Sequence, residues 1–569
     1  MRERHGLSLN LGAWLLVATG LLAACGSGDR TPTLIVRGGT ILTVNDQDES
    51  AQAMAIRDGL IVAVGSEAEV LALKGPRTEM IDLHGRVVLP GFVAAHEHPT
   101  LSAIFKSTHD LSGFKHKSNA EVWAALREAV AQTPKGDWVY AGGIDAILTP
   151  DLQVPMRQAL DQIAPEHPVL LISQTLHSAW ANTKAFEKAG VKRDTPDPGQ
   201  GAFYERDSQG EFTGFIAETR AIAPFITDLK SPLKLFGRYE AALDGYLAQG
   251  FTSVASLGYN VPPLMARYVA SKDLRPRLRQ FFYLVEDELK YLPEVPQTDN
   301  PFFRIVGVKL WHDGSPYTGS MQTSAPYLDS PLARKLGIPP GSHGEAMISV
   351  PTLAEKIKTY RTAGWQVAIH SQGDDSNREV AAAIALAGLP PSHGPLVRVE
   401  HGVMMPSEVV QQFAALNVTP SFHINHILYY GDALRDAIIG SAAAEQLLPV
   451  RQASELGMHP TLHADSPMFP ANGFSLMQTA ITRLSSSGRS INPAQAISIQ
   501  QALRAMTRNG AYQLGIAHQA GTLEAGKWAD FQIVDRNPYA VPPQELSQLK
   551  TLGVFVAGRL SYGASSFAK

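Results

Sequence analysis

The feature that most constrains this chain is a set of five short polar segments, each placed at or just after a run of strand-forming residues. In chain order these are HEH at 96–98, VKLWHDGS around Lys309, IHSQGD around His370, VEHG around His401 and HADSP around Asp465. Side chains that end successive parallel strands can converge only where those ends meet, which is the C-terminal mouth of a barrel. The order of the segments therefore predicts an α/β fold with one site at that mouth.

The bulk composition limits the class of protein. With 569 residues the chain is too long for one ordinary hydrophobic core, so we expect a large domain with a satellite or an insertion. Hydrophobic residues make up 44% and charged residues 18%, which is typical of a soluble globular protein. The net charge is −4 and no long basic run is present, so we expect no nucleic acid partner.

The first 25 residues have the features of a bacterial lipoprotein signal peptide. Arg2 and Arg4 precede an apolar stretch over 11–22 that is too short to span a membrane as a mature helix. The stretch is followed by small residues and then by Cys25, the only cysteine of the chain, in a pattern that resembles a lipobox. We therefore expect a signal peptide over 1–25, removed on maturation, and a lipid anchor on Cys25.

A short polar segment over 26–33 follows as a tether. Because no Asp comes directly after Cys25, the expected location is the cell envelope, lipid-anchored at the periplasmic face of the outer membrane. The alternative is an ordinary secretory peptide with an incidental cysteine.

Both ends of the mature chain are rich in predicted strands. Residues 34–90 contain alternating apolar runs, and Asp58-Gly59 between two of them is typical of a β-hairpin turn. Residues 516–569 contain a matching set of runs. We expect the two ends to form one small β-sandwich that closes around the domain between them; the alternative is two separate β-rich appendages.

The middle of the chain, 91–515, is predicted to be a TIM (β/α)8 barrel with a large insertion after its first strand. Between His98 and Lys309 lie 210 residues, roughly twice what two barrel strands and their helices need. We place the insertion at about 100–235. Within it, Ser118 precedes an amphipathic stretch with the pattern of a capped helix.

The histidines and Asp465 have the composition of a metal site. His96 and His98 alternate on one strand, so their side chains share a face. His370 and His401 each end an apolar strand, where a single histidine is more often a core residue. Asp465 could instead cap a following helix. The order of all five along the barrel favours metal binding, with Asp465 also holding the proton of a metal-bound water.

Lys309 ends a buried strand, where a bare ammonium is costly to bury. Reaction with CO2 would convert it into a carbamate, an anionic ligand that can bridge two metals. The alternative is a lysine whose amine reaches solvent or pairs with Asp313. The spacing alone leaves both interpretations open.

The chain resembles the amidohydrolase superfamily, in its family 3 branch. The segments that carry the resemblance are PGFVAAHEHP, HSAWANTKAF, GFTSV, VKLWHDGSPYTG, IHSQGD, RVEHG, PSFHINHILYYGD, HADSP and GTLEAGKWADFQIVD. The resemblance implies that His96 and His98 hold one metal and that His370 and His401 hold a second. It further implies a carbamate on Lys309 between the two metals, and Asp465 as the last ligand and the base.

The chain departs from the family pattern at two positions. Ala94 stands where many relatives have Asp, which puts metal tuning rather than metal binding in doubt. Gln372 follows His370 where relatives often have another residue, and it could alter the pocket. Three further residues, His177, His426 and Asp313, are candidates for substrate binding; turn-stabilising hydrogen bonds are the alternative role.

These observations predict a metal-dependent hydrolase that cleaves the C–N bond of a small amide-like substrate. A metal-bridged hydroxide would attack the carbonyl, and Asp465 would take the proton and return it to the leaving nitrogen. We expect two divalent ions, zinc first, with Mn or Fe also suitable. The oligomeric state stays open, with a homodimer as one option.

Two other functions compete with this prediction. The first is a deaminase of the same superfamily with a mononuclear site, which commonly uses a Glu three residues after the strand-five histidine. Here that position is Gly373. The second is a non-catalytic lipoprotein that only binds a ligand, and the presence of Asp465 argues against it.

Overall fold

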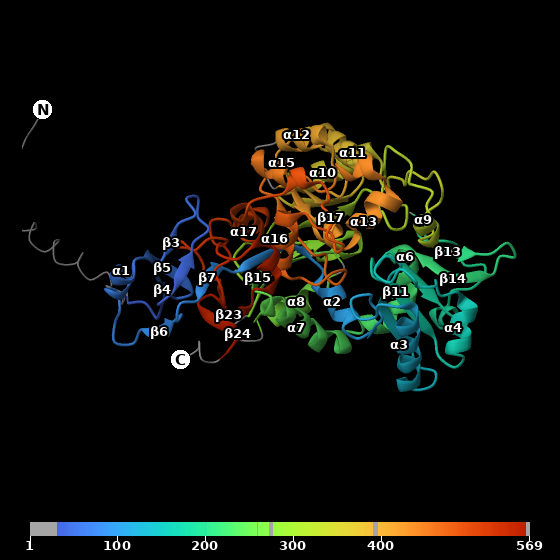
Figure 1. Cartoon of the computed structure of the whole chain (residues 1–569), viewed down its shortest axis with the longest axis horizontal. Coiled ribbons are helices and arrows are strands. Elements are labelled where there is room, and N and C mark those ends of the chain that lie inside the picture. Colours follow the sequence, from blue (N-terminus) through green and yellow to red (C-terminus); the bar gives the residue numbers. More distant parts are fainter. Residues whose placement is uncertain are drawn as a thin grey trace, which may run out of the picture.

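The structure is a computed structural model that describes residues 31–199, 201–258, 260–271, 277–296, 298–390 and 396–564. A central barrel separates a small two-sheet domain from an inserted domain (Figure 1). The predicted signal peptide, Cys25 and most of the tether lie outside the described residues. Within the described ranges, no helix combines the length and the apolar character needed to cross a membrane.

Eight parallel strands form the central barrel. Their order in the sheet is β8, β15, β16, β17, β18, β19, β20, β21, and β21 also lies against β8, so the sheet nearly closes. The strands are β8 (Phe92–Glu97), β15 (Phe251–Leu257), β16 (Arg279–Leu284), β17 (Phe303–Trp311), β18 (Gln366–Ser371), β19 (Val397–His401), β20 (Val418–Phe422) and β21 (Thr461–Leu462). The predicted TIM barrel is confirmed.

Helices cover the outside of the barrel, which explains the composition of its strands. Every residue of β15, β18 and β19 is buried, because a parallel barrel has side chains inside and helices outside. The covering helices are α7 (Pro232–Ala248), α8 (Pro263–Ser271), α10 (Val350–Thr362), α11 (Asp374–Leu386), α12 (Ser407–Ala415), α15 (Val450–Glu455), α16 (Gly473–Thr482), α17 (Ile499–Met506) and α18 (Arg508–Gln513). The apolar runs that the sequence shows are therefore the strands of the barrel.

The small domain has two sheets and takes strands from both ends of the chain. One sheet has the order β5-β4-β1-β6 and the other β24-β23-β22-β7-β2-β3. The strands are β1 (Leu34–Arg37), β2 (Thr40–Leu42), β3 (Ser50–Ala51), β4 (Ala53–Arg57), β5 (Leu60–Gly65), β6 (Glu79–Asp82), β7 (Val87–Pro90), β22 (Phe531–Val534), β23 (Thr551–Val556) and β24 (Arg559–Gly563). The predicted sandwich of both termini is confirmed.

Packing and turn chemistry explain the sandwich. Val36 and Ile56 from the N-terminal end share one buried core with Phe531 and Phe555 from the C-terminal end. At the predicted hairpin between β4 and β5, Asp58 and Gly59 have φ values of 53° and 79°. A tight hairpin needs positive φ at both central residues, which Asp and Gly tolerate.

The insertion between β8 and β15 has its own mixed sheet, in the order β13-β14-β12-β11-β10-β9. Its strands are β9 (His109–Asp110), β10 (Val139–Ile144), β11 (Val169–Ser173), β12 (Ser178–Ala181), β13 (Phe203–Arg206) and β14 (Phe212–Ala217). Its helices are α2 (Pro99–Phe105), α3 (Asn119–Gln132), α4 (Arg157–Ile163), α5 (Thr183–Ala189) and α6 (Glu218–Ile222). The Ser118 side chain accepts a hydrogen bond from the Glu121 N–H, so the predicted cap of α3 is confirmed.

Candidate metal centre

All six predicted ligands lie at the C-terminal end of a barrel strand. His96 is in β8, Lys309 in β17 and His370 in β18, and His401 is the last residue of β19. His98 directly follows β8, and Asp465 comes three residues after the end of β21. Because these strands are parallel, their ends meet at one mouth of the barrel. The fold therefore gathers residues that are up to several hundred positions apart in the sequence.

Asp465 is at the centre of the group. Its Oδ1 lies 3.2 Å from His96 Nε2 and 3.0 Å from His98 Nε2. Its Oδ2 lies 4.0 Å from His401 Nδ1 and 3.9 Å from His423 Nδ1. The remaining predicted histidine, His370, lies next to His401, because the centres of their rings are 4.5 Å apart. We refer to the histidine rings around Asp465 as the arc.

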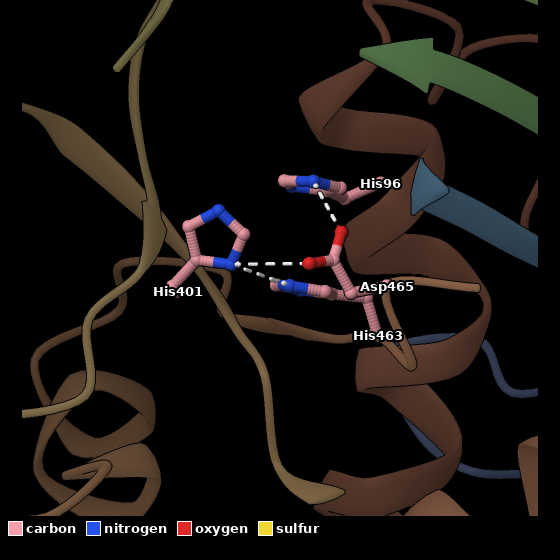
Figure 2. Close-up of side chains that lie close together, drawn as sticks. All are labelled: His96, His401, His463 and Asp465. Atoms are coloured by element: carbon pink, nitrogen blue, oxygen red, sulfur yellow. Dashed lines mark hydrogen bonds and ion pairs between the residues drawn. The ribbon is translucent and has the colours of Figure 1, made fainter. Parts of the chain in front are cut away.

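Four side chains of the centre have possible ligand atoms within 4.8 Å of one another: His96, His401, His463 and Asp465. Figure 2 shows the three imidazole rings around the Asp465 carboxylate. This spacing suits one shared cation, since ligand atoms at about 2 Å from an ion lie within roughly 4 Å of each other. His463 is the member that the sequence analysis missed. The signal was present, because a residue two positions before Asp465 points to the same side in an extended chain.

The backbone is strained at two members of the centre. His401 has φ 73° and Asp465 has φ 57°, values that are uncommon for residues other than glycine. Consecutive side chains of a strand normally point to opposite faces, but the positive φ at His401 allows both Glu400 and His401 to point into the centre. Glu400 contacts His96, and His401 contacts His463. Such strain persists where the surrounding packing holds it, and it is frequent at functional sites.

Burial sets the protonation of the centre. It holds the pKa of His370, His401 and His463 well below the usual range, so these imidazoles are neutral with a lone pair free. Burial alone would raise the pKa of Asp465, but the adjacent His96 and His98 hold it well below its usual range. The centre thus offers neutral nitrogens around an ionised carboxylate.

Several buried atoms of the centre have no hydrogen-bond partner among the described residues. They are His98 Nδ1 and Lys309 Nζ, together with His96 Nε2 and Asp465 Oδ1, which lie 3.2 Å apart but not in hydrogen-bonding geometry. Leaving a buried polar atom unsatisfied costs about 1–3 kcal/mol, so such a group of atoms indicates a missing ligand. Imidazole nitrogens and a carboxylate oxygen are the donor set that a divalent ion such as zinc prefers. These residues fit a metal.

Lys309 is the least ordinary member. Its side chain is buried, and burial lowers the pKa of the amine to about 8 while Glu400 and Asp465 oppose the shift. The described part of the chain supplies no hydrogen-bond acceptor for Nζ, so the structure does not show the pairing with Asp313 that the sequence left open. A neutral amine is the form that reacts with CO2, and the lowered pKa makes more of it available near neutral pH.

A buried ion pair supports the centre from below. Glu400 Oε2 lies 2.6 Å from His96 Nδ1, and Glu400 Oε1 lies 2.9 Å from Arg398 Nε. A carboxylate on one ring nitrogen fixes the tautomer and leaves the other nitrogen free for a metal. Glu400 therefore turns His96 Nε2 toward Asp465. This role of Glu400 could not be predicted from the sequence, because the contact joins residues of two strands that are 304 positions apart.

The three predicted substrate-binding residues have different surroundings. His177 precedes β12 of the insertion, and its ring centre is 6.4 Å from that of His370. His426 begins η3 (His426–Tyr430), and its ring centre is 4.1 Å from that of His423. Within the described residues, His426 Nε2 is buried and has no hydrogen-bond partner.

Asp313, the third, is fully buried behind the centre. Its carboxylate accepts hydrogen bonds from the backbone N–H groups of Gln322, Gln372 and Gly373, and Oδ1 lies 3.7 Å from His370 Nε2. These contacts hold the loops on both sides of His370. Substrate binding by Asp313 stays a prediction.

Comparisons with known proteins show what this chain is similar to. The profile of the Amidohydrolase family matches residues 79–562. The N-substituted formamide deformylase of Arthrobacter pascens is 25% identical over 546 residues, which cover 93% of this chain and 98% of the relative. An uncharacterized metal-dependent hydrolase from Pyrococcus horikoshii OT3 has a TM-score of 0.72 at 22% identity, covering 90% of this chain and 99% of its own. A second such hydrolase, from Pyrococcus furiosus, has a TM-score of 0.69 at 23% identity, with coverage of 89% and 99%.

The predicted resemblance is confirmed, and it supports the coarse part of the predicted function, a metal-dependent hydrolase. The match covers β6 and β7 of the N-terminal part of the sandwich, β22 and β23 of its C-terminal part, the barrel and every strand end that carries a candidate ligand. The chain belongs to the Amidohydrolase family.

Proposed function

We propose that the protein hydrolyses the C–N bond of a small amide-like substrate at the barrel mouth, with Asp465 as general base. The observation that carries the proposal is the convergence of buried imidazoles on one ionised carboxylate whose Oδ1 has no hydrogen-bond partner among the described residues. The similarity to an N-substituted formamide deformylase supports an amide-like substrate.

The proposal includes two divalent metal ions, zinc first, with Mn or Fe also suitable. His96, His98, His370, His401 and Asp465 would hold them, and Lys309 as a carbamate would lie between them. When bound, such ions polarise a carbonyl and lower the pKa of water to near neutrality. The neutral state of the buried imidazoles supports this assignment.

The chain's own residues then handle protons and the substrate. Asp465 is ionised because its pKa is held well below the usual range, so it can accept a proton from the attacking water. In the simplest form it returns that proton to the leaving nitrogen. His426 is neutral, since burial holds its pKa well below the usual range. Its Nε2 has no hydrogen-bond partner among the described residues and could donate a hydrogen bond to the substrate carbonyl.

The deaminase alternative commonly uses a Glu where this chain has Gly373. A Cβ at that position would lie 1.7 Å from the backbone oxygen of Gln322, so no side chain fits there without a backbone shift. This packing supports hydrolysis of an amide over deamination.

A turnover screen tests the proposal. Metal-loaded protein would be assayed against N-formyl amines, N-acyl amino acids, cyclic imides and carbamates, and against aminated heterocycles for the deaminase alternative, with release of amine and of ammonia measured separately. We expect amine release from at least one class. Ammonia release from an aminated ring would favour the deaminase, and tight binding with no turnover in any class would favour the binding lipoprotein.

We also propose, from the sequence, that Cys25 carries a lipid anchor at the periplasmic face of the outer membrane. Several acyl chains on one residue bind a bilayer firmly, at about 0.8 kcal/mol per buried methylene. Native protein should partition into detergent, and Cys25→Ser should release it or stall its processing. A wild-type protein that is fully soluble in the periplasm and has no lipid on its N-terminal peptide would contradict the anchor.

A further inference from the structure

The insertion brings one more histidine to the barrel mouth, and it is locked to a glutamate. His177 directly precedes β12 and Glu218 directly follows β14, and these two strands pair antiparallel with Ser178 opposite Ala217. The Glu218 N–H donates to the His177 carbonyl over 2.7 Å, and Glu218 Oε2 lies 2.8 Å from His177 Nδ1. Backbone and side chain thus both join residues that are 41 positions apart.

The backbone at Glu218 indicates that this arrangement is held by its surroundings. Glu218 has φ 65°, in the left-handed region, and the residue is buried. Its second oxygen, Oε1, accepts hydrogen bonds from the hydroxyls of Thr318 and Ser320 at 3.5 and 3.4 Å. Both hydroxyls follow β17, the strand of Lys309, so the glutamate also ties the insertion to the barrel.

His177 is the most open ring of the arc around Asp465. Its side chain is 22% exposed, against 11% for His98 and 4% for His370. Because Nδ1 is occupied by Glu218, Nε2 is the nitrogen left for a substrate or for solvent.

The charges around His177 favour its protonated form. Burial lowers the pKa of His177, but the Glu218 carboxylate, with Asp465 and Asp313, more than offsets this, and the net shift is upward. His370, whose ring centre is 6.4 Å from that of His177, is neutral because burial holds its pKa well below the usual range. At six other histidines of the centre, burial lowers the pKa instead. They are His98, His370, His401, His423, His426 and His463.

We propose that His177, oriented by Glu218, is the acid that protonates the leaving nitrogen, so that the insertion supplies half of the proton chemistry. The inference rests on the proposed function and divides the two transfers given there to Asp465. Water forms the new C–O bond and leaves its proton on Asp465. The electron pair of the breaking C–N bond takes the Nε2 proton of His177. Asp465 then releases its proton to solvent, and the open His177 ring takes one up.

Leaving-group chemistry distinguishes this role from simple binding. The test uses an N-alkyl amide and a 4-nitroanilide that share one acyl group accepted in the turnover screen. An alkylamine is too basic to leave without a proton, whereas 4-nitroaniline depends on one far less. His177→Gln and Glu218→Gln should lower kcat for the alkyl amide by about 10²-fold, with KM little changed and a much smaller loss for the anilide.

Three further readouts separate positioning from folding. In Glu218→Gln the basic limb of the pH-rate profile should move to lower pH, because the lost carboxylate no longer raises the pKa of the acid. Glu218→Asp should retain part of the rate, and added imidazole should restore part of the rate of His177→Ala. His167→Gln, which removes another histidine of the insertion, one bonded to the Thr133 carbonyl, is the matched control and should retain both activities.

The outcomes assign failure to one proposal or the other. If both substrates lose rate equally, or if only KM changes, His177 is not the acid and this inference is wrong while the hydrolase stands. If wild-type protein with full metal content cleaves neither substrate nor any other amide, the proposed function fails and the inference fails with it.

Discussion

Two buried ionic groups, one at the barrel–sandwich interface and one at the barrel mouth, show how burial can serve structure or function. At the interface, Arg279 of β16 binds Asp530 through two hydrogen bonds of 2.6 and 2.9 Å, and its third nitrogen donates to the Pro301 carbonyl. The guanidinium also stacks 3.7 Å from the Trp528 ring centre, and the Ala557 N–H donates to Asp530. Each charge there has its partners.

The metal centre is also largely buried, with the Asp465 side chain 18% exposed against 4% for Asp530, but its polar atoms are less fully partnered. Lys309 Nζ, His96 Nε2 and Asp465 Oδ1 have no hydrogen-bond partner within the described ranges, and two of the residues around them have strained backbones. A protein that satisfies one buried ion pair fully and leaves another group of donors open is built to bind something at the second place. Both regions are buried and charged, and they differ in whether each buried polar atom has a hydrogen-bond partner among the described residues.

Removing one charge from the complete pair should have the largest effect on stability. Asp530→Ala leaves Arg279 buried and unpaired, which should lower the free energy of unfolding by about 3–5 kcal/mol. Urea unfolding of the metal-free protein measures this. The folded variant should still bind the wild-type amount of metal. Asp329→Ala, in an exposed pair with Arg334, is the control and should change little. Loss of metal with unchanged stability would break the comparison.

The same kind of change at the incomplete group should affect chemistry instead. Asp465→Asn keeps the size and one oxygen ligand but cannot accept a proton, so activity should fall by about 10²-fold or more. Steady-state turnover and metal analysis of the same preparation measure both effects, and the histidine-bound metal should largely remain. Asp329→Asn neutralises an exposed carboxylate as the control. Near-normal turnover in Asp465→Asn would remove this residue from the chemistry and favour the binding lipoprotein.

Glu400 takes part in a structural ion pair and also contacts a candidate metal ligand, so its replacement should affect metal affinity without abolishing metal binding. Glu400 is paired with Arg398 like a structural ion, yet it also orients His96 toward the centre. Glu400→Gln should weaken metal affinity by roughly 10–100-fold, the usual effect of losing a partner behind a ligand. A competition titration with a chelating dye measures the affinity. Glu379→Gln, whose carboxylate pairs with His312 and not with a candidate ligand, should leave metal affinity unchanged. Equal losses in both variants would indicate general destabilisation.

The barrel, the sandwich and the strand-end residues could be predicted because each follows from a local pattern. Apolar runs fix the strands, the Asp58-Gly59 pair fixes a hairpin, and a ligand at the end of each run is placed by the parallel order. His463 was within reach of the same argument, since it alternates with Asp465.

The contacts that the sequence analysis missed depend on pairings that the sequence does not encode locally. Glu218 meets His177 only because β12 and β14 pair, and Glu400 meets His96 only because the barrel closes around them. The positive φ at His401 is likewise set by packing and not by residue type. Long-range pairing thus decides which polar residue becomes the partner of a predicted one.

The smallest effect we predict is a change in the shape of a pH profile, and it tests the chemistry of Lys309 directly. Its amine pKa is lowered to about 8, so the neutral fraction at fixed CO2 should rise about fivefold from pH 7 to pH 8 and less than about twofold from pH 8 to pH 9. An ordinary lysine, with a pKa near 10.5, would keep gaining about tenfold per pH unit over the same range. If a carbamate completes the centre, the rate at which stripped protein regains activity with zinc and bicarbonate should follow the first profile. Lys309→Ala should lose most activity and all dependence on bicarbonate, and acetate or propionate should restore part of the activity by filling the gap. An unmodified amine in the intact protein, one metal per chain and an active Lys309→Ala would show that the lysine is structural, and the single-metal alternative would then be favoured.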